Sequence, residues 1–406
     1  MKIQGIESSV DDGGAAIVEI DPFSREVLAD PYAHHPQLRD AGPVVWFPKY
    51  GVFGVARYGE VKTVLSDWQT YCSSRGVGLA DFARETPWRT PSLLLERDPP
   101  LHAATRGVMN KVVALPRLKS LAPHWKQVAA ELVESLAGRR RFDAVQDLAE
   151  QFPLRIFPDT LGLLKEGREN LLAYATSTFN AFGPRNDVFL ESQVGLDAAQ
   201  AWIAEACRYQ NLAPGGWGRD VHDAAAEAGI SEGERELLVR SFLSAGIDTT
   251  INGIGNLLHA FTLHPTEWQK LRSDRSLIKR AFEEGLRWQG TAQSFFRTTT
   301  RETELSGVRL PEGAKIIAFL AAANRDPRHW PDAERFDITR QTSGHVGFGY
   351  GIHQCLGQMI ARQESEILLE ALSSRFASFR AAGASERRLN NTLFALRSLP
   401  VEVDLA

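Results

Sequence analysis

The feature that most constrains this sequence is one cysteine, Cys355, which stands between a glycine-rich segment and a helical pattern. The segment reads Phe348-Gly349-Tyr350-Gly351-Ile352-His353-Gln354-Cys355-Leu356-Gly357, and the pattern Gln358-Met359-Ile360-Ala361-Arg362 follows it. Cys355 is therefore expected at the start of a helix, where the helix dipole and free backbone N–H groups favour a thiolate over a thiol. Such a sulfur is a candidate metal ligand or nucleophile.

Three kinds of chemistry are open to this cysteine. A nucleophile would need a general base, and His353, two residues away, is not expected to face Cys355 without special loop geometry. A zinc site would need a second cysteine at finger-like spacing, and Cys72 and Cys207 have no comparable context, so both are expected to be inert core residues. A haem iron needs only one strong protein ligand, and glycines let the backbone approach the porphyrin. Haem binding therefore requires the fewest further residues, whereas a cysteine hydrolase would contain no haem.

Composition narrows the class of protein further. The chain has 406 residues, of which 43% are hydrophobic, so it can bury a large core. Lysine and arginine number 46 against 50 aspartate and glutamate, a formal net charge of −4 that gives no argument for a nucleic-acid partner. Three cysteines argue against a disulfide framework and for a reducing compartment, which predicts a cytoplasmic location.

The amino terminus carries no targeting signal in this interpretation. Its only apolar stretch, residues 15–20, is too short for a signal peptide or a membrane anchor, so a soluble protein without membrane contact is expected. Residues 1–20 are predicted to be flexible. Since no repeat, linker or low-complexity tract is visible, residues 21–406 are expected to form one domain that is mainly α with a small β portion.

Local patterns predict the individual elements. Residues 44–47 and 52–56 are expected to form a hairpin, and strands are expected at 295–301 and at 308–310 with 314–320, a pair that flanks a turn at 311–313. Helices are predicted at 60–65, 123–136, 148–161, 168–179, 196–207 and 355–375, with Pro123 in a first helical turn.

One predicted helix is unusually long. Ser231 and Glu234 have capping-box spacing, and no proline interrupts the pattern before Pro265, so about 34 residues would span about 50 Å. Its middle, residues 244–250, contains a glycine, an acid and two threonines, which are poor helix formers. A requirement other than helix stability is expected to select them.

At this point the residues carry a resemblance to a known family. Phe348-x-x-Gly351-x-x-x-Cys355-x-Gly357 resembles the haem-binding loop of cytochromes P450. The resemblance covers the chain beyond about residue 20 and implies the P450 fold, haem b as cofactor, Cys355 as the axial ligand of the iron, and Phe348 and Gly349 beside the haem. It also implies a buried structural network. Glu284-Gly285-Leu286-Arg287 resembles the family's Glu-x-x-Arg helix. Residues 336–340 resemble the segment whose arginine completes that network, which is Arg340 in this sequence.

Further matches imply roles around the haem. Ala245-Gly246-Ile247-Asp248-Thr249 is similar to the oxygen-binding kink of the family's central helix. Reduction of O2 consumes protons in a mostly dry site, and an acid beside an alcohol can deliver them through hydrogen-bonded water, so Asp248 is expected to be the relay and Thr249 the donor or organiser. The haem propionates need cationic or hydrogen-donating partners, and the resemblance implies His102, Arg106, Arg297 and His353.

Four segments, at residues 72–79, 87–92, 178–184 and 211–216, together resemble the bacterial P450 subgroup that oxidises para-substituted benzoic acids. In that subgroup polar groups hold the carboxylate far from the iron, and the para substituent points at the haem. Thr178 stands where the subgroup can carry an aliphatic residue, which leaves the preferred substituent open. The resemblance implies O-demethylation of 4-methoxybenzoate or hydroxylation of 4-alkylbenzoates. The implied substrate contacts are Arg89, Ser92, Arg240 through water, Ser241, with Ser244 nearby, and an apolar slot made by Phe179, Phe182 and Phe295.

The electron source is expected to be external, because the chain shows no flavin or dinucleotide fingerprint. By resemblance, the partners are an iron–sulfur ferredoxin and its flavoprotein reductase, with O2 as the oxidant and a monomer as the working form. Lys111, Arg117 and Lys119 are candidates for a docking surface. Alternatives are a P450 with a different small hydrophobic or carboxylate substrate, a haem-thiolate sensor without turnover, and a peroxide-driven enzyme.

Overall fold

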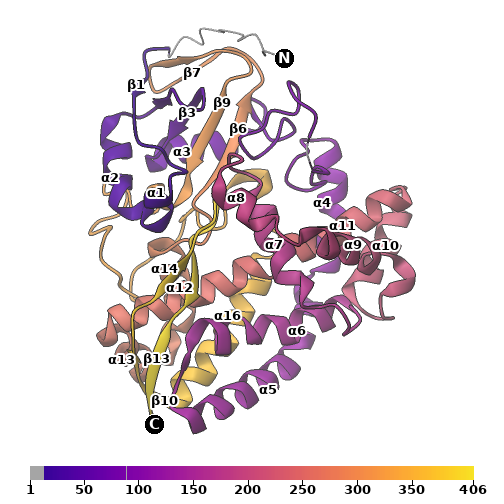
Figure 1. Cartoon of the computed structure of the whole chain (residues 1–406), viewed down its shortest axis with the longest axis vertical. Helices are drawn as coiled ribbons and strands as arrows, with labels where there is room; N and C mark the ends of the chain where they lie inside the picture. The colour runs from indigo at the N-terminus through magenta and orange to yellow at the C-terminus, as the bar shows by residue number, and fades with distance from the viewer. Residues whose placement is uncertain (1–12, 88) are drawn as a thin grey trace.

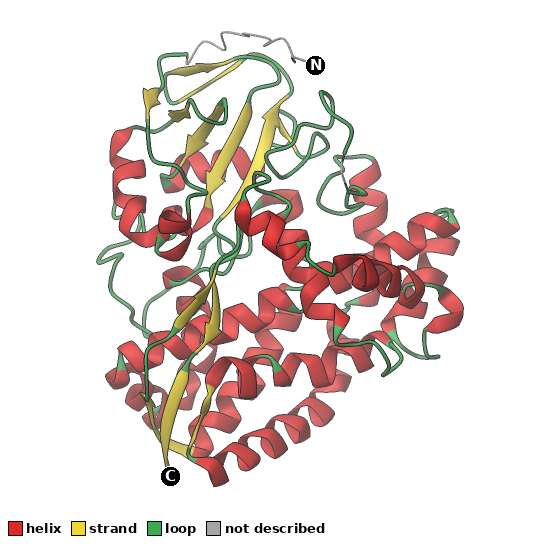
Figure 2. Ribbon diagram, in the orientation of Figure 1, coloured by secondary structure: helices red, strands yellow, loops and turns green. Residues whose placement is uncertain are grey.

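The computed structural model describes residues 13–87 and 89–406. Helices form most of the molecule, and the largest sheet lies at one end of its long axis (Figures 1 and 2). This arrangement confirms the prediction of a mainly α fold with a small β portion. The helices are α1 Arg25–Ala29, α2 Pro31–Ala41, α3 Tyr58–Ser66, α4 Leu101–Val112, α5 Leu115–Arg139, α6 Gln151–Leu161, α7 Asn170–Asn180, α8 Asp187–Ser192, α9 Leu196–Ala206, α10 Trp217–Glu227, α11 Glu232–Ala245, α12 Asp248–Leu263, α13 Pro265–Ser273, α14 Ile278–Trp288, α15 Leu320–Ala323 and α16 Gln358–Arg375.

A six-stranded sheet has the order β1-β2-β3-β9-β6-β4, and smaller sheets join β10-β13-β5, β11-β12 and β7-β8. The predicted hairpin is confirmed, since β2 and β3 pair antiparallel with Trp46 opposite Phe53. The strands are β1 Ala16–Ile17, β2 Val45–Phe47, β3 Val52–Val55, β4 Tyr71–Cys72, β5 Arg141–Asp143, β6 Ser294–Thr299, β7 Thr303–Leu305, β8 Val308–Leu310, β9 Lys315–Phe319, β10 Phe376–Ala381, β11 Glu386–Arg388, β12 Ala395–Ser398 and β13 Pro400–Leu405.

The amino-terminal segment contributes to the large sheet. Ala16 and Ile17 pair with β2, and the backbone N–H of Val18 donates to the carbonyl of Trp46 at 2.9 Å. The predicted flexible segment 1–20 therefore contains a strand in its last part, while residues 1–12 lie outside the described residues. No helix among residues 13–87 and 89–406 has the length and apolar character needed to cross a bilayer.

The strands around the turn at residues 311–313 pair differently from the prediction. β8 pairs with β7, whereas β9 pairs with β3 and β6, so the two segments are not partners of each other. Gly313 has φ +76°, a left-handed conformation that suits glycine and redirects the chain from the small sheet into the large one. A turn signal identifies the reversal, but long-range pairing decides which strands meet.

The predicted helices at 60–65, 148–161, 168–179, 196–207 and 355–375 correspond to α3, α6, α7, α9 and α16. A π-helical segment, Ala144–Ala149, precedes α6. The prediction that Pro123 occupies a first turn is wrong, because α5 begins at Leu115 and Pro123 lies inside it. A proline there leaves the carbonyl of Lys119 without its usual donor, and exposure of both residues lets water take that place.

The prediction of one long helix after Ser231 is also wrong, since α11 ends at Ala245 and α12 begins at Asp248. The break lies at Gly246, where a Cβ atom would stand 2.6 Å from Cε1 of Phe157. Across it, the hydroxyl groups of Thr249 and Thr250 donate to the carbonyls of Ala245 and Gly246 at 2.6 and 3.1 Å. Ser231 lies at the N-cap position of α11, but its hydroxyl donates to the Glu234 carboxylate at 2.9 Å and accepts from no backbone N–H of this helix, so the capping box is not complete.

Candidate active site

Cys355 lies on a tight loop three residues before α16. Its backbone N–H donates to the carbonyl of Phe348 at 2.8 Å, which closes the loop over Gly349 and Gly351. Both glycines have left-handed φ angles, +71° and +74°, and a Cβ on Gly351 would stand 2.6 Å from the carbonyl oxygen of Leu65. Glycine is thus required where the loop passes the end of α3.

The local charge does not by itself produce the thiolate that the helix position predicts. Burial raises the pKa of the Cys355 thiol, while the backbone N–H of Gly357 and the guanidinium groups of Arg106 and Arg362 act in the opposite direction. The sulfur lies before the helix and not in its first turn, which explains the weaker effect of the helix dipole. Coordination to a metal cation supplies the missing positive charge, because a coordinating thiol is deprotonated.

A buried cluster of basic side chains adjoins the loop. It contains His102 and Arg106 from α4, Arg297 from β6 and His353 from the loop itself. The two imidazole rings lie 4.4 Å apart between centroids. Arg106 donates to the carbonyl of Gln354 at 2.7 Å, and burial lowers the pKa of Arg297 to about 10.

This cluster has unused hydrogen-bonding capacity. The Nε2 atoms of His102 and His353 are buried and have no hydrogen-bond partner among the described residues. Burial, together with His353 and Arg106, lowers the pKa of His102 to about 4. Asp98 lies 3.7 Å from Nε2 of His353, and despite its burial its contacts with His353 and Ser74 lower its pKa to about 2. Buried cations and orphaned ring nitrogens fit the two carboxylates of a haem, so these residues and Cys355 fit the cofactor.

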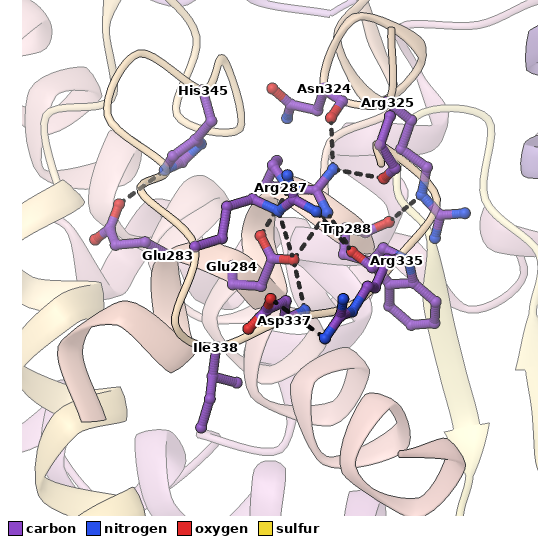
Figure 3. A network of polar contacts seen from close by, with 12 residues as sticks. Glu283, Glu284, Arg287, Trp288, Asn324, Arg325, Arg335, Asp337, Ile338 and His345 are labelled. Carbon is purple, nitrogen blue, oxygen red and sulfur yellow. Dashed lines mark hydrogen bonds and ion pairs between the residues drawn. The ribbon is translucent and has the colours of Figure 1, made fainter. Parts of the chain in front are cut away.

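Behind the loop, Glu284 and Arg287 form a fully buried ion pair on α14, with N–O distances of 2.6 and 2.8 Å (Figure 3). Arg287 also donates to the carbonyls of Asn324, Ala333 and Arg335 at 2.8 to 3.0 Å. The Nε atom of Arg340 lies 3.4 Å from Glu284, although Arg340 donates its hydrogen bonds to carbonyl groups. The structure therefore brings all three predicted network residues together.

The network reaches the cysteine loop through two contacts. The Asn324 side chain accepts from the N–H of Val346 at 2.8 Å. His345 contacts Glu283 at 2.7 Å (Figure 3). Both contacts fix the segment that leads into Phe348. The network thus connects α14 to the position of Cys355.

Asp248 is fully buried at the start of α12, next to Thr249. Its carboxylate accepts from Thr176 of α7 and from Asn252, both at 2.9 Å, and forms an ion pair with Arg388 of β11. Arg388 also donates to Thr176. The sequence analysis missed Thr176 and Arg388, which lie 72 and 140 residues from Asp248 and carry no local signal.

A cavity of about 910 Å³ contains most of the predicted substrate contacts. Phe179 and Phe295 do not line it but pack against Phe182, with ring centroids 5.8 and 5.9 Å away. Trp88, in the matching segment 87–92, lies outside the described residues. The predicted residues that line the cavity are Arg89, Ser92, Phe182, Arg240, Ser241 and Ser244.

The two arginines of this cavity have different partners. Arg89 forms an ion pair with Glu96, whose side chain is fully buried, and its guanidinium lies 4.8 Å from the centre of the Phe182 ring. Arg240 donates to the carbonyl of Thr90 at 3.2 Å, and among the described residues it forms no ion pair. Glu96 was missed by the sequence analysis because it ends a run of leucines and matches no motif.

Comparisons with known proteins agree with this geometry. A family model described as cytochrome P450 matches residues 208–405. Cytochrome P450 CYP199A2 of Rhodopseudomonas palustris is 50% identical over 96% of this chain and 95% of its own length. Cytochrome P450 107B1 of Saccharopolyspora erythraea is 32% identical over 86% of this chain and 88% of its own length.

Solved structures show the same fold. CYP109Q5 from Chondromyces apiculatus is 28% identical with a TM-score of 0.81, covering 96% of this chain and 99% of its own. Cytochrome P450 CREJ, in complex with (4-ethylphenyl) dihydrogen phosphate, is 26% identical with a TM-score of 0.85, covering 95% and 99%. With the cysteine loop, the basic cluster and the Glu284–Arg287 pair in place, the chain belongs to the cytochrome P450 family of monooxygenases, whose cofactor is haem b.

Proposed function

We propose that this P450 oxidises small aromatic carboxylic acids at a substituent para to the carboxylate. One observation carries the proposal: Arg240, which forms no ion pair among the described residues, lines a single cavity with serine hydroxyls and two aromatic rings. A buried carboxylate must be paired or multiply hydrogen-bonded, and these groups meet that requirement. The similar P450 CREJ, whose ligand joins a para-substituted ring to an anionic group, gives further support.

Arg240 and Ser92 are the main contacts to the carboxylate in this proposal. The Ser92 oxygen accepts from the N–H groups of Leu94 and Leu95 at 3.3 and 3.1 Å, so its own proton can be donated to the substrate. Ser241 adds a second hydroxyl once it releases the carbonyl of Leu237. Arg89, held by Glu96, covers the face of Phe182 and closes the apolar slot.

When bound, haem b activates O2 and inserts one oxygen atom into the substrate while the other leaves as water. Asp248 would relay the protons that this reaction consumes, and Thr249 would donate or organise them, since a buried acid adjoins a hydroxyl at the break between α11 and α12. With 4-methoxybenzoate the methyl carbon leaves as formaldehyde and 4-hydroxybenzoate remains. The ring carboxylate stays unchanged and keeps the substrate oriented.

The electrons come from an iron–sulfur ferredoxin and its flavoprotein reductase in this proposal, and residues 21–406 act as one monomeric haem domain. Lys111 and Lys119 are exposed on α4 and α5 and are the docking candidates. Arg117 is paired with Asp220, so its charge is partly neutralised.

An optical titration of the haem-loaded protein tests the proposal. Reduction under carbon monoxide should give the red-shifted band of a thiolate-ligated haem, and 4-methoxybenzoate should shift the resting haem to high spin. The neutral analogue 4-methoxybenzamide serves as the control and should bind at least about tenfold more weakly, since it lacks the charge that pairs with Arg240. Equal affinity for acid and amide would reject the carboxylate as the recognised group.

A further inference from the structure

A second cavity of about 420 Å³ lies on another part of the molecule. It is lined by the start of α2, the end of α14 and the β11–β12 hairpin, and it shares no lining residue with the 910 Å³ cavity. Its walls include Tyr32, Trp288, Arg325, Arg387 and Phe394. Three aromatic rings and two guanidinium groups therefore meet in one space that the proposed monooxygenase reaction does not use.

Both guanidinium groups stack on aromatic faces. Arg325 lies 4.0 Å from the ring centre of Tyr32 and 4.5 Å from that of Trp288, and Arg387 lies 3.7 Å from that of Phe394. Stacking uses the flat face of a guanidinium and leaves the N–H groups along its edge for acceptors in the same plane. A planar anion is the acceptor that such an edge fits best.

Arg325 and Arg387 differ in how many of their N–H groups donate hydrogen bonds to the protein. Arg325 donates to the carbonyl of Trp288 at 2.6 Å and to the carboxylate of Glu334 at 2.8 Å (the bond to Trp288 is visible in Figure 3). Arg387 donates to the side-chain oxygen of Asn256 at 3.4 Å, and within the described part of the chain it forms no ion pair. Burial lowers the pKa of Arg387 to about 10, so the group is still charged at neutral pH but is poorly solvated.

We propose that this cavity is a second ligand site, which binds an aromatic monocarboxylate through Arg387. The carboxylate pairs with Arg387, which forms no ion pair within the described part of the chain, and the ring lies among Tyr32, Trp288 and Phe394. Asp30 also lines the cavity, and its negative charge acts on Arg387, so a singly charged anion is repelled less than a doubly charged one such as phosphate. The site is independent of the substrate class proposed above, because it uses none of the same residues.

Calorimetric titration of the haem-loaded protein with 4-fluorobenzoate tests the site. The iron is first saturated with 4-phenylimidazole, a neutral haem ligand, so that a benzoate cannot bind beside the iron. One molar equivalent of 4-fluorobenzoate should still bind. Arg387→Gln should weaken that binding by about tenfold or more, as expected for a lost charge-assisted hydrogen bond, whereas Arg397→Gln, at an exposed position of the same hairpin, should not.

Tyr32→Leu provides a second variant that removes an aromatic wall without changing a charge, and it should also weaken binding. The carbon monoxide spectrum of each variant reports whether its haem site is intact. Absence of binding to the blocked native protein, or binding that neither variant weakens, would reject the site. Equal competition by inorganic phosphate would reject the aromatic class. None of these outcomes depends on the response to 4-methoxybenzoate at the haem.

Discussion

Glu96 gives the two arginines of the large cavity different electrostatic environments. Its buried carboxylate accepts from Arg89 and from the N–H groups of Ser92 and Val77. Arg89 therefore offers a partly neutralised charge, whereas Arg240 has no acid partner in the described part of the chain and donates only to a carbonyl. Recognition of a substrate carboxylate should depend mainly on Arg240, although both arginines line the same space.

We predict that Arg240→Gln weakens binding of 4-methoxybenzoate by about ten- to a hundredfold, because a charge-assisted hydrogen bond is lost. Binding of 4-methoxybenzamide should change little. The spin-state titration measures both dissociation constants, and Arg235→Gln, on the same helix but outside the cavity lining, is the matched control. Loss of affinity for acid and amide alike would assign Arg240 a packing role.

A second residue-scale prediction concerns the fully buried Asp248 and its partner Arg388. Arg388→Gln removes the cation from this pair, so we expect a fall in product formed per NADH consumed and an altered solvent isotope effect on turnover. The dissociation constant for substrate should stay near the native value, since Arg388 does not line the large cavity. Arg397→Gln is the control, and an unchanged isotope effect with unchanged coupling would contradict a role in proton delivery.

At the scale of elements, Gly246 decides where α11 ends. The ring of Phe157 from α6 occupies the space that a side chain would need. Gly246→Ala should destabilise the protein by about 1 to 3 kcal/mol, the usual cost of overpacking. Gly255 in α12 is a matched control, because its nearest contact for an added Cβ is 3.7 Å, and Gly255→Ala should be neutral or slightly stabilising. Urea unfolding of the two variants measures their midpoints, and equal midpoints for Gly246→Ala and Gly255→Ala would reject the steric explanation.

Local patterns predict elements well where the determinants are local, and the break at Gly246 shows where they do not. Hydrophobic periodicity passes through Gly246 without interruption, and only the resemblance of residues 245–249 to the family's kink marks this place in the sequence. The ring of Phe157, which leaves no room for a side chain at Gly246, lies far upstream in the chain. The partners of β9 were likewise set by pairing beyond the adjacent strand, since β9 pairs with β3, far upstream in the chain, and with β6. By contrast, the β2–β3 hairpin and α16 follow from adjacent residues and were predicted closely.

The same distinction applies to the site. Cys355, Asp248 and Glu284 belong to short motifs, so the sequence alone predicts them as candidates. Glu96 and Arg388 belong to none, and their roles come from buried charges that must be paired once the chain has folded. The partners of a recognised residue are therefore the part of the site that requires the structure.

At the scale of the whole molecule, α16 runs from the cysteine loop along α5 through the helical part of the protein (Figure 1). Glu364 lies on this helix, fully buried, and neither of its carboxylate oxygens has a hydrogen-bond partner among the described residues. Burial raises its pKa from 4.5 to about 8. The helix thus carries a carboxyl group that is stable in the core only in its protonated form.

This raised pKa predicts how the stability of the fold depends on pH. Between about 4.5 and 8 the native state binds a proton that the unfolded chain has lost, so stability is fully present below this window and falls as pH rises through it. Glu364→Gln removes the titration and keeps the shape. The free energy of unfolding of native protein should fall relative to the variant by up to about 1.4 kcal/mol per pH unit.

Urea unfolding at pH 5.5, 6.5 and 7.5 measures the difference in free energy of unfolding between native protein and the Glu364→Gln variant. Groups that titrate equally in both proteins do not contribute to this difference. Glu370→Gln, on the same helix at a half-exposed position, should instead follow the native protein across the series. A gap between native protein and the Glu364→Gln variant that stays constant from pH 5.5 to 7.5 would show that Glu364 is ionised, or solvated, in the folded state. A free energy of unfolding of native protein that falls relative to the variant as pH rises would establish that the helix behind the haem loop contains a protonated carboxyl whose ionisation limits the stability of the molecule in alkaline solution.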